Sequence, residues 1–177
     1  MNDLAGQIEI RRAVPSDAGL ISLLGAVTFY EAYFEQDEPD SLADYIHEAF
    51  APNKIRAEIE GADAEFFIIF RNGRAVGYAK LRTGSKADGI ESENSVELQR
   101  IYVVERVFGK GVGERLLRHC LETARARGFE TLWLGVWEEN RRAQRFYEKH
   151  GFRRVGTLTF PYGDTVGINH VMEKSLK

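Results

Sequence analysis

The sequence is poor in cysteine, since Cys120 is the only one among 177 residues. A single thiol forms no disulfide within the chain and leaves no cysteine pair for a structural zinc site. Long apolar runs are also missing, and none approaches the roughly 18 residues that a membrane-spanning helix needs. The opening residues MNDLAGQIEI lack the apolar stretch of a signal peptide. We therefore expect a cytoplasmic protein with no membrane partner.

Basic runs are absent as well. The formal net charge is -3, and the sequence has no basic stretch interleaved with aromatic residues, the pattern typical of nucleic-acid binding. Histidines are few and do not have the spacing of metal ligands. They are His47, His119, His150 and His170. We therefore expect neither a nucleic-acid partner nor a metal.

Acidic residues, in contrast, are concentrated in one segment. Residues 13–53 contain eight Asp or Glu and no Lys or Arg. Such a surface attracts a cationic substrate and orients it, and Glu31 and Glu35 are the expected contacts. The alternative is an ordinary solvated helix surface, which is the commoner role of a charge run.

Hydrophobic periodicity predicts a single domain over residues 1–177 in which strands and helices follow one another. Ser16 is the expected N-cap of the first helix. Asn72-Gly73 lies between two apolar runs and predicts a type I′ hairpin, and a second hairpin is expected around PYGD, residues 161–164. The apolar stripe of the first helix would contain Leu20, Leu23, Leu24, Val27 and Tyr30.

The order of these elements predicts the fold class. It is β-α-α-α-β-β-β-α-β-α-β-β, which indicates an α/β (α+β) fold with a mixed sheet and helices on both faces. The expected helices cover residues 17–34, 39–50, 52–61, 111–128 and 140–150. The expected strands cover residues 8–13, two runs within 65–82, then 96–104, 131–136, 152–160 and 166–176.

Three glycines, Gly109, Gly111 and Gly113, separate the strand at 96–104 from the helix after it. No Gly-Lys-Ser/Thr follows, so this is not a Walker loop, and Glu114 stands where a dinucleotide fingerprint needs its third glycine. A strand, a glycine loop and a helix start nevertheless expose several backbone N–H groups beside the positive end of a helix, and that geometry binds a pyrophosphate. A tight turn without a ligand is the alternative.

A second motif follows downstream, N-x-x-A-x-x-F-Y-x-x-x-G-F over residues 140–152. Together with the glycine loop it resembles the GCN5-related N-acetyltransferase (GNAT) superfamily, over the whole chain. The stretches TFYEAY, VELQRIYV and WLGVWE resemble the bacterial PaiA-type spermidine/spermine N-acetyltransferases in particular. The resemblance implies a mostly antiparallel central sheet of about seven strands and acetyl-coenzyme A as the co-substrate, with its pyrophosphate in the glycine loop.

The resemblance also implies which residues bind the cofactor. One departure concerns Phe108, which replaces the usual Arg or Gln at the head of the loop. Because backbone amides make most phosphate contacts, we expect altered binding rather than its loss, with Arg106 as a partial substitute. The implied cofactor-binding residues are Ile101, Tyr102, Val103, Phe108, Gly109, Lys110, Gly111, Val112, Gly113, Glu114, Asn140, Phe146 and Lys149.

Tyr147 and Glu97 are the expected catalytic residues. An amine attacks a thioester only when it is neutral, so a base is needed, and the thiolate that leaves benefits from an acid. The resemblance places the acid at Tyr147 and a base acting through water at Glu97. The alternative for Tyr147 is a core aromatic without a catalytic role, and the alternative for Glu97 is an ordinary exposed acid on a strand. Cys120 falls on an apolar helix face, which favours direct transfer over an acyl-enzyme.

The sequence therefore predicts an N-acetyltransferase that acts on a small amine, with a polyamine as the first choice and Trp137 as a further substrate contact. Acetylation of a peptide or protein amine is the first alternative. A non-catalytic regulatory module that binds coenzyme A is the second, and Phe108 is the one residue that favours it. A homodimer is possible.

Overall fold

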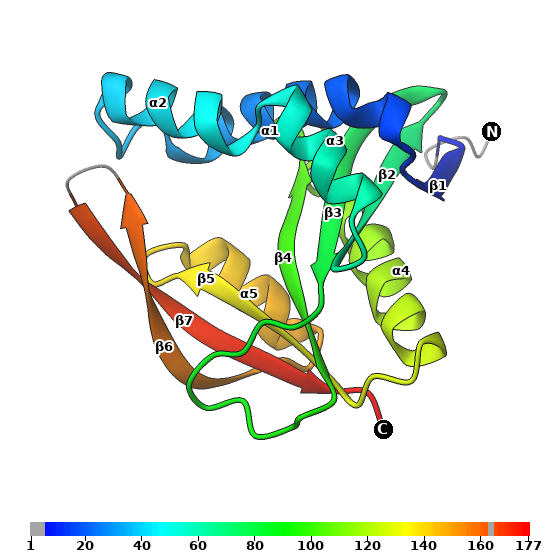
Figure 1. The fold of residues 1–177 in the computed structure, drawn as a ribbon, viewed down its shortest axis with the longest axis vertical. Helices are drawn as coiled ribbons and strands as arrows, with labels where there is room; N and C mark the ends of the chain where they lie inside the picture. The colour runs from blue at the N-terminus through cyan, green and yellow to red at the C-terminus, as the bar shows by residue number, and fades with distance from the viewer. Residues whose placement is uncertain (1–5, 163–164) are drawn as a thin grey trace. The chain divides into compact units, whose positions relative to one another are not determined.

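The computed structural model describes residues 6–162 and 165–177 (Figure 1). The order of its elements is the predicted one. The strands are β1 (Ile8–Arg12), β2 (Ala64–Arg71), β3 (Arg74–Arg82), β4 (Ser95–Val103), β5 (Thr131–Trp137), β6 (Arg153–Tyr162) and β7 (Thr165–Ser175). The helices are α1 (Ala18–Tyr33), α2 (Pro39–Ala49), α3 (Pro52–Glu60), α4 (Val112–Ala126) and α5 (Arg141–Lys149), with short 3-10 turns η1 (Pro15–Asp17) and η2 (Glu105–Val107).

The strands pair in the order β1-β2-β3-β4-β5-β7-β6. β4 and β5 run parallel, whereas β1–β2, β5–β7 and β6–β7 are antiparallel, so the sheet is mixed and mostly antiparallel, as predicted. The chain divides into two compact units. The first consists of residues up to Leu81 with Arg100–Cys120, and the second of Arg82–Gln99 with Leu121–Lys177.

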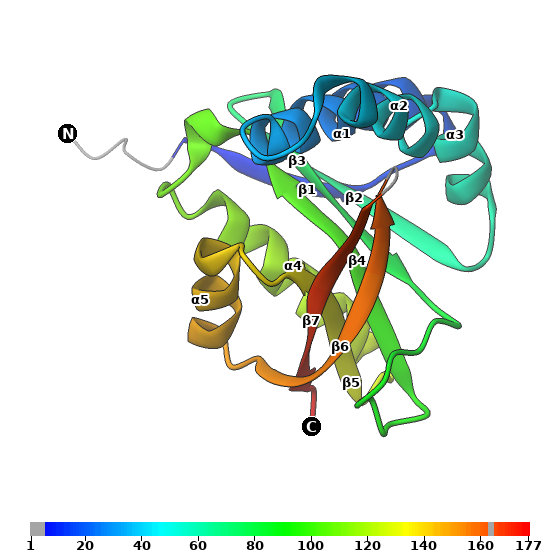
Figure 2. The ribbon, with the colours of Figure 1, turned by 90° about the vertical axis from the view of Figure 1, so that its left-hand side faces the viewer.

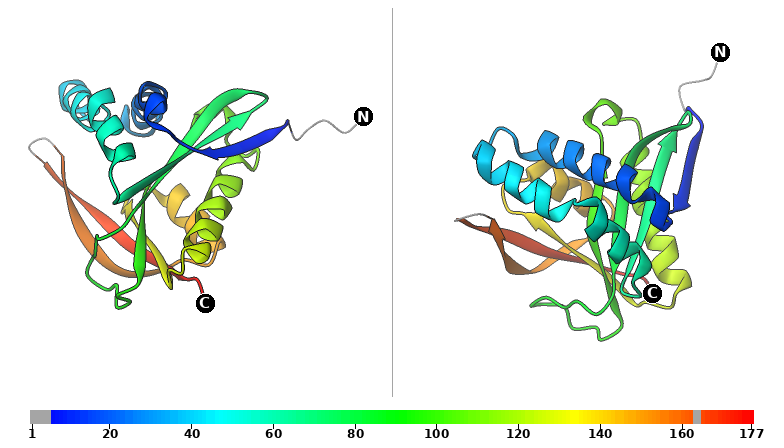
Figure 3. Two further views of the ribbon diagram at one scale, coloured as in Figure 1. Left: turned by 45° about the vertical axis from the view of Figure 1, so that its right-hand side comes forward. Right: turned by 45° about the horizontal axis from the view of Figure 1, so that its top comes forward.

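In the first unit, helices cover both faces of the strands β1–β3. Figure 3 shows α1, α2 and α3 on one face and α4 on the other. β2 reads EFFIIF because both of its faces are buried, which favours a continuous apolar run over alternation. The ring of Phe67 lies 4.7 Å from that of His119 in α4, while Phe66 on the opposite face lies 5.3 Å from the Lys80 Nζ atom.

The β2–β3 hairpin turns at Asn72 and Gly73. Their φ angles are 51° and 71°, the left-handed values that a type I′ turn needs at both central positions. The prediction of this hairpin is therefore confirmed. The turn of the second hairpin, between β6 and β7, includes residues 163 and 164, which lie outside the described part of the chain.

Two predictions for α1 are wrong. Ser16 does not cap the helix, because the chain enters α1 through η1, where the Asp17 carboxylate accepts a hydrogen bond of 2.9 Å from the Val14 N–H and is paired with Arg11 at 2.7 Å. The predicted stripe is also not the buried face: Leu23 and Tyr30 are more than half exposed. Leu24 is the one member of that stripe that the structure buries, together with Ile21, Gly25, Thr28 and Phe29.

The hydrophobic pattern of α1 does not explain which of its faces is buried; packing contacts do. Gly25 lets the ring of Phe50 approach so closely that a Cβ atom there would lie 2.3 Å from the Phe50 Cδ1 atom. The hydroxyl group of the buried Thr28 is satisfied within the helix, since its Oγ1 donates a hydrogen bond to the Leu24 carbonyl at 2.7 Å. Because α1 carries apolar residues all round, only packing selects the face.

In the second unit, β5 lies between β4 and β7, and α5 lies against one face of these strands (Figure 2). β5 pairs with β7 over its whole length, from Thr131↔Ser175 to Trp137↔Asn169. Its run TLWLGV is almost wholly buried, as expected for an inner strand. No helix among the described residues combines the length and apolar character that crossing a membrane requires.

Replacement of Gly25 by alanine tests the packing of α1. The added methyl group would meet the Phe50 ring, and overpacking of this kind costs about 1–3 kcal/mol of unfolding free energy. Gly19→Ala is the matched control, since it lies in the same helix, meets nothing within 4 Å and should stabilise by up to ~1 kcal/mol. Urea denaturation followed by circular dichroism measures both, and equal effects would contradict this packing.

Candidate functional site

The glycine loop lies in the first unit, between η2 and α4. Gly109 and Gly111 have φ angles of 73° and 74°, the left-handed region that residues with a Cβ atom avoid. The two glycines reverse the chain so that α4 can start at Val112. The local reason for glycine is therefore the backbone conformation at 109 and 111.

Space and hydrogen-bonding capacity at this loop fit a diphosphate. A Cβ atom built on Gly109, Gly111 or Gly113 would meet nothing within 4 Å outside the adjacent residues, so the space beside the loop is open. The N–H groups of Val112 and Gly113 have no acceptor within the helix, because the residues four positions back precede it. They donate no other hydrogen bond in the described part of the chain. Open space beside unbonded N–H groups at a helix N-terminus is the arrangement that holds anionic oxygens.

Phe108, the one departure from the family pattern, does not fill this space. It follows η2 with an extended backbone and is 38% exposed. Its ring lies more than 4 Å from the Cβ positions built on Gly111 and Gly113. Lys110 turns back instead, since its Nζ donates to the Arg106 carbonyl at 2.8 Å. Glu114 pairs with Arg118 on the next turn at 3.0 Å.

β4 leads into the loop, and the ladder that joins it to β5 is short. Only three positions pair, from Ser95↔Thr131 to Glu97↔Trp133, although β4 continues to Val103 and β5 to Trp137. Ile101, Tyr102 and Val103, the residues expected to contact the cofactor arm, come after the last of these pairs. The printed β4–β5 pairs therefore lie on the N-terminal side of these three residues.

The acidic segment is mostly solvent-exposed. Glu35, Glu38, Asp40, Asp44 and Glu48 lie on the exposed surface of the first unit. Glu31 has a different role, because its Oε2 accepts a hydrogen bond of 2.9 Å from the Glu105 N–H and so ties the end of α1 to the turn before the glycine loop. Of the two acidic residues predicted to contact the substrate, Glu35 is therefore exposed and Glu31 has a structural partner.

The second unit contains the other motif. Asn140 caps α5 as predicted, since its Oδ1 accepts from the Ala143 N–H at 3.0 Å. Gln144 adds an anchor that the sequence analysis missed: its Nε2 donates to the carbonyls of Trp137 and Glu138, at 3.0 and 2.7 Å. The buried amide therefore fixes the start of α5 to the end of β5. The charged residues around Gln144, Arg142 and Arg145, gave no signal that its amide would be buried.

Tyr147 is buried in an aromatic group on α5. It is 8% exposed, and its ring lies 5.4 Å from that of Phe146 and 5.6 Å from that of Phe152, both edge to face. Lys149 at the end of α5 is exposed, and Trp137 at the end of β5 is half-buried. The structure therefore gives Tyr147 a packing role, and that role leaves its predicted chemistry untouched.

Glu97 is not the exposed strand acid that was its alternative. It is 7% exposed, and its Oε2 accepts hydrogen bonds from Arg82 Nε and Nη2, both at 2.7 Å, and from Ser85 Oγ at 2.8 Å. These donors lie at the end of β3 and in the loop after it. The carboxylate is therefore held as one partner of a charge-assisted network, which sequence spacing did not indicate.

Cys120 is a core residue, as predicted. Its side chain is fully buried, and burial raises the pKa of its thiol, so the thiolate that an acyl-enzyme would need is disfavoured. Within residues 6–162 and 165–177, no group of His, Cys, Asp and Glu side chains has the arrangement of a metal site.

Comparison with known sequences decides the family. The profile of the acetyltransferase (GNAT) family matches residues 26–152, most of the chain. The chain belongs to the GNAT family of acetyltransferases. An uncharacterized N-acetyltransferase of Mycobacterium tuberculosis is 31% identical over 161 residues, which cover 91% of this chain and 99% of that protein. An uncharacterized N-acetyltransferase of Lactobacillus delbrueckii subsp. lactis is 28% identical over 84% of this chain and 86% of that protein.

Solved structures show the same GNAT fold. The PaiA N-acetyltransferase of Thermoplasma acidophilum, solved in complex with coenzyme A, superposes with a TM-score of 0.79. The match covers 96% of this chain and 99% of that one, at 23% sequence identity. This GNAT protein is therefore an acyltransferase by family, and its fold is that of a structure that holds coenzyme A.

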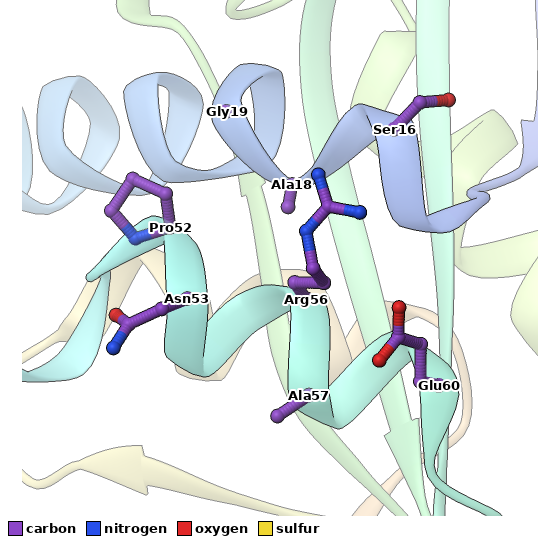
Figure 4. Close-up of a pocket in the computed structure, with 8 residues that line it drawn as sticks. All are labelled: Ser16, Ala18, Gly19, Pro52, Asn53, Arg56, Ala57 and Glu60. Carbon is purple, nitrogen blue, oxygen red and sulfur yellow. The ribbon is translucent and has the colours of Figure 1, made fainter.

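A groove in the first unit lies apart from the predicted site residues. Its volume is about 570 Å³, and it lies between the start of α1 and α3, with Arg56 extending from α3 toward α1 (Figure 4). No predicted site residue lines it. The lining residues are Ser16, Ala18, Gly19, Pro52, Asn53, Arg56, Ala57 and Glu60.

Gly113→Ala tests whether the loop binds the cofactor. Gly113 lies within α4, so alanine should keep or raise the melting temperature, while its methyl group would occupy the open space where a phosphate oxygen would lie. We expect the Kd for coenzyme A, measured by calorimetry, to rise roughly tenfold, a loss of about 1.4 kcal/mol. Gly19→Ala, in a helix away from the loop, should leave that Kd unchanged. An unchanged Kd in Gly113→Ala would exclude the loop as the phosphate site.

Proposed function

We propose that this GNAT protein transfers the acetyl group of acetyl-coenzyme A directly to the primary amine of a small molecule. The observation that carries the proposal is the glycine loop, whose left-handed backbone, open surface and unbonded N–H groups fit the cofactor's diphosphate. Loop residues 108–114 would supply these contacts. From the second unit, Asn140, Phe146 and Lys149 are assigned to the cofactor by resemblance alone.

The backbone of β4 supplies a second element of the proposal. Ile101, Tyr102 and Val103 follow the last pair of the β4–β5 ladder, so their main-chain groups are suited to bond an extended arm that carries amides. A backbone N–H of the same segment would donate to the acetyl carbonyl oxygen as negative charge develops on it. Such a donor acts without any reorganisation of the protein.

The acceptor amine must lose a proton to react. At pH 7 a lysine-like amine with a pKa near 10.4 needs about 4.6 kcal/mol for this step. We assign the proton to Glu97, through water, and a proton for the departing thiolate to Tyr147. The ammonium nitrogen loses two protons in all, one to Glu97 before attack and one as the new N–C bond forms. The C–S bond breaks and the sulfur takes a proton from Tyr147, which the second nitrogen proton replaces, so one proton is released overall. The buried, raised-pKa thiol of Cys120 supports transfer without an acyl-enzyme.

The acceptor class has one sequence-based hypothesis, a polyamine. The exposed acidic residues of α2 and of the turn before it support it as a surface that concentrates cations. No described contact favours a peptide acceptor. The regulatory-module alternative depended on Phe108, and the ring at that position stays clear of the open side of the glycine loop.

The activity is tested by thiol release from acetyl-coenzyme A with a panel of amines. Tyr147→Phe should lower kcat by roughly 10²–10⁴-fold, the usual contribution of a positioned acid, while the Kd for coenzyme A stays within a factor of two or so. Phe keeps the ring contacts with Phe146 and Phe152, so the fold is preserved. Phe152→Leu serves as a packing control, since Phe152 contacts the Tyr147 ring and has no assigned role at the site. An unchanged kcat in Tyr147→Phe would show that Tyr147 is not the acid. If none of the amines in the panel causes thiol release, the proposed function is refuted.

Glu97→Gln separates a base from a structural ion pair. If Glu97 takes the proton, the rate at neutral pH should fall and the pH–rate profile should move to higher pH, because the amine must then deprotonate unaided. Arg82→Gln is the control, since it breaks the same buried pair from the other side. Both variants should be less stable by about 1–3 kcal/mol, the cost of leaving a buried polar group without its partner, because Arg82 is 40% exposed and the pair is not fully buried. Identical pH profiles for the two variants would assign Glu97 to structure only.

A further inference from the structure

Unused polar groups lie together in the first unit, around Arg100. We call Arg100, Tyr45, Phe50, Tyr78 and Tyr102 the Arg100 cluster. Tyr78 comes from β3, Arg100 and Tyr102 from β4, and Tyr45 from α2, with Phe50 directly after it. Tyr78 and Tyr102 stack with their ring centroids 6.1 Å apart. No residue of the cluster except Tyr102 has a place in the mechanism above, and Tyr102 has one only through its backbone.

The guanidinium of Arg100 has two protein neighbours. Its Cζ lies 4.7 Å from the centroid of the buried Phe50 ring. Tyr45 is the second neighbour: burial raises the pKa of its phenol, and the charge of Arg100 opposes the rise. The Nη1 nitrogen of Arg100, although shielded from solvent, has no hydrogen-bond partner among the described residues. A guanidinium carries five N–H donors, so part of its capacity is unused.

Charge balance around Arg100 is incomplete. The neighbouring buried cation, Lys80, is neutralised by Glu58, with the Nζ and Oε2 atoms 3.0 Å apart. No such carboxylate is paired with Arg100 in the described part of the chain. A charge removed from water without a partner is costly, and most buried charges in proteins are paired. Lys80 therefore follows the usual rule, whereas Arg100 lacks an anion.

Tyr78 is a second donor without a partner. Its side chain is fully buried, and its hydroxyl forms no hydrogen bond with any described residue. Burial raises the pKa of Tyr78, so the phenol stays protonated and remains a donor at all physiological pH values. Tyr78 stacks on Tyr102, and Arg100 precedes Tyr102 by two residues on β4, so the side chains of Arg100 and Tyr102 project from the same face of the strand. Tyr102 differs, because it has a hydrogen bond with Tyr33.

We infer that the acceptor amine carries a carboxylate, and that the Nη1 of Arg100 and the hydroxyl of Tyr78 bind it. This inference rests on the proposed function and names the substrate class of that reaction. The two unpaired groups are both donors, and a carboxylate offers only acceptors, with two oxygens that suit a guanidinium and a phenol side by side. Arg100, Tyr45 and Tyr102 are half-buried, so the cluster borders the surface. The Nη1 of Arg100 and the hydroxyl of Tyr78 are themselves shielded from solvent, so a carboxylate reaches them only when the half-buried side chains move.

The same groups disfavour a polyamine in the cluster. A polyamine has no acceptor for either donor and would bring a second positive charge to Arg100, which is repulsive at short range. The acidic surface of α2 remains available to attract the ammonium end of a zwitterion before it loses its proton. A water molecule that bonds to both donors is the competing explanation, and it predicts no preference among amines.

Matched amines test the inference. γ-Aminobutyrate, butylamine and putrescine share a four-carbon skeleton with an amine at one end. Their other ends are anionic, neutral and cationic, respectively. Alanine and alaninamide form a second pair, and spermidine represents the longer polyamines. Thiol release gives kcat and KM for each, and calorimetry of γ-aminobutyrate with the protein alone gives a Kd that needs no turnover. We expect γ-aminobutyrate or alanine to exceed its neutral counterpart by roughly 10- to 100-fold in kcat/KM, the size of a charge-assisted hydrogen bond.

Two variants identify the groups responsible. Arg100→Gln should abolish the preference for the carboxylate, mostly through KM, while butylamine keeps its kcat/KM. Tyr78→Phe removes a hydroxyl without a protein partner, so its melting temperature should not fall, yet KM for the carboxylated amine should rise several-fold. Arg74→Gln removes an exposed arginine from the start of β3 and should leave the preference intact. A purely structural Arg100 would instead lower kcat/KM for all amines equally.

The outcomes separate this inference from the proposed function. Higher kcat/KM for putrescine or spermidine, or a carboxylate preference that survives in Arg100→Gln, would overturn the inference and leave the acetyltransferase activity standing. Binding of γ-aminobutyrate that depends on Arg100, with no thiol release from any amine, would support the carboxylate site and overturn the proposed function. If γ-aminobutyrate does not bind and no amine causes thiol release, both the inference and the proposed function are overturned. Should Arg100→Gln unfold, Tyr78→Phe alone decides between the carboxylate and a bridging water.

Discussion

The left-handed backbone at Gly109 and Gly111 is the constraint on which the proposed cofactor binding depends. It lets the chain leave η2 and start α4 with unbonded N–H groups facing open space. The contacts offered to a diphosphate are thus main-chain groups, which no side-chain substitution removes. This explains how the loop can keep its function while Phe108 replaces the polar residue usual in the GNAT family, since the side chain at 108 need not touch the ligand.

The buried charges of the protein follow one rule with one exception. Glu97 is paired with Arg82, Asp17 with Arg11 and Lys80 with Glu58, so the cost of removing each from water is offset by a partner. Arg100 has only a tyrosine and an aromatic face. Arg100 is half-buried, but its Nη1 is shielded from solvent and has no hydrogen-bond partner among the described residues, and this is the basis for inferring a carboxylated acceptor.

Most of the fold was predictable because its signals are local. The φ angles at Asn72 and Gly73 follow from the chemistry of a two-residue turn, and the cap at Asn140 from a short side chain that reaches the next turn. The limits of α2 and α3 follow from Pro39 and Pro52, whose rings are accepted only in a first helical turn. The same locality made the glycine loop recognisable.

By itself, therefore, the sequence determined the order of the elements, the glycine loop and membership of the GNAT family, because these depend on residues near one another along the chain. Tertiary structure alone decided which face of α1 is buried, since Gly25 and Phe50 meet only in the fold. It also decided that Glu97 is ion-paired and that Arg100 is not. Whether a charged side chain forms an ion pair depends on distances in space, and its partner can come from a distant position along the chain.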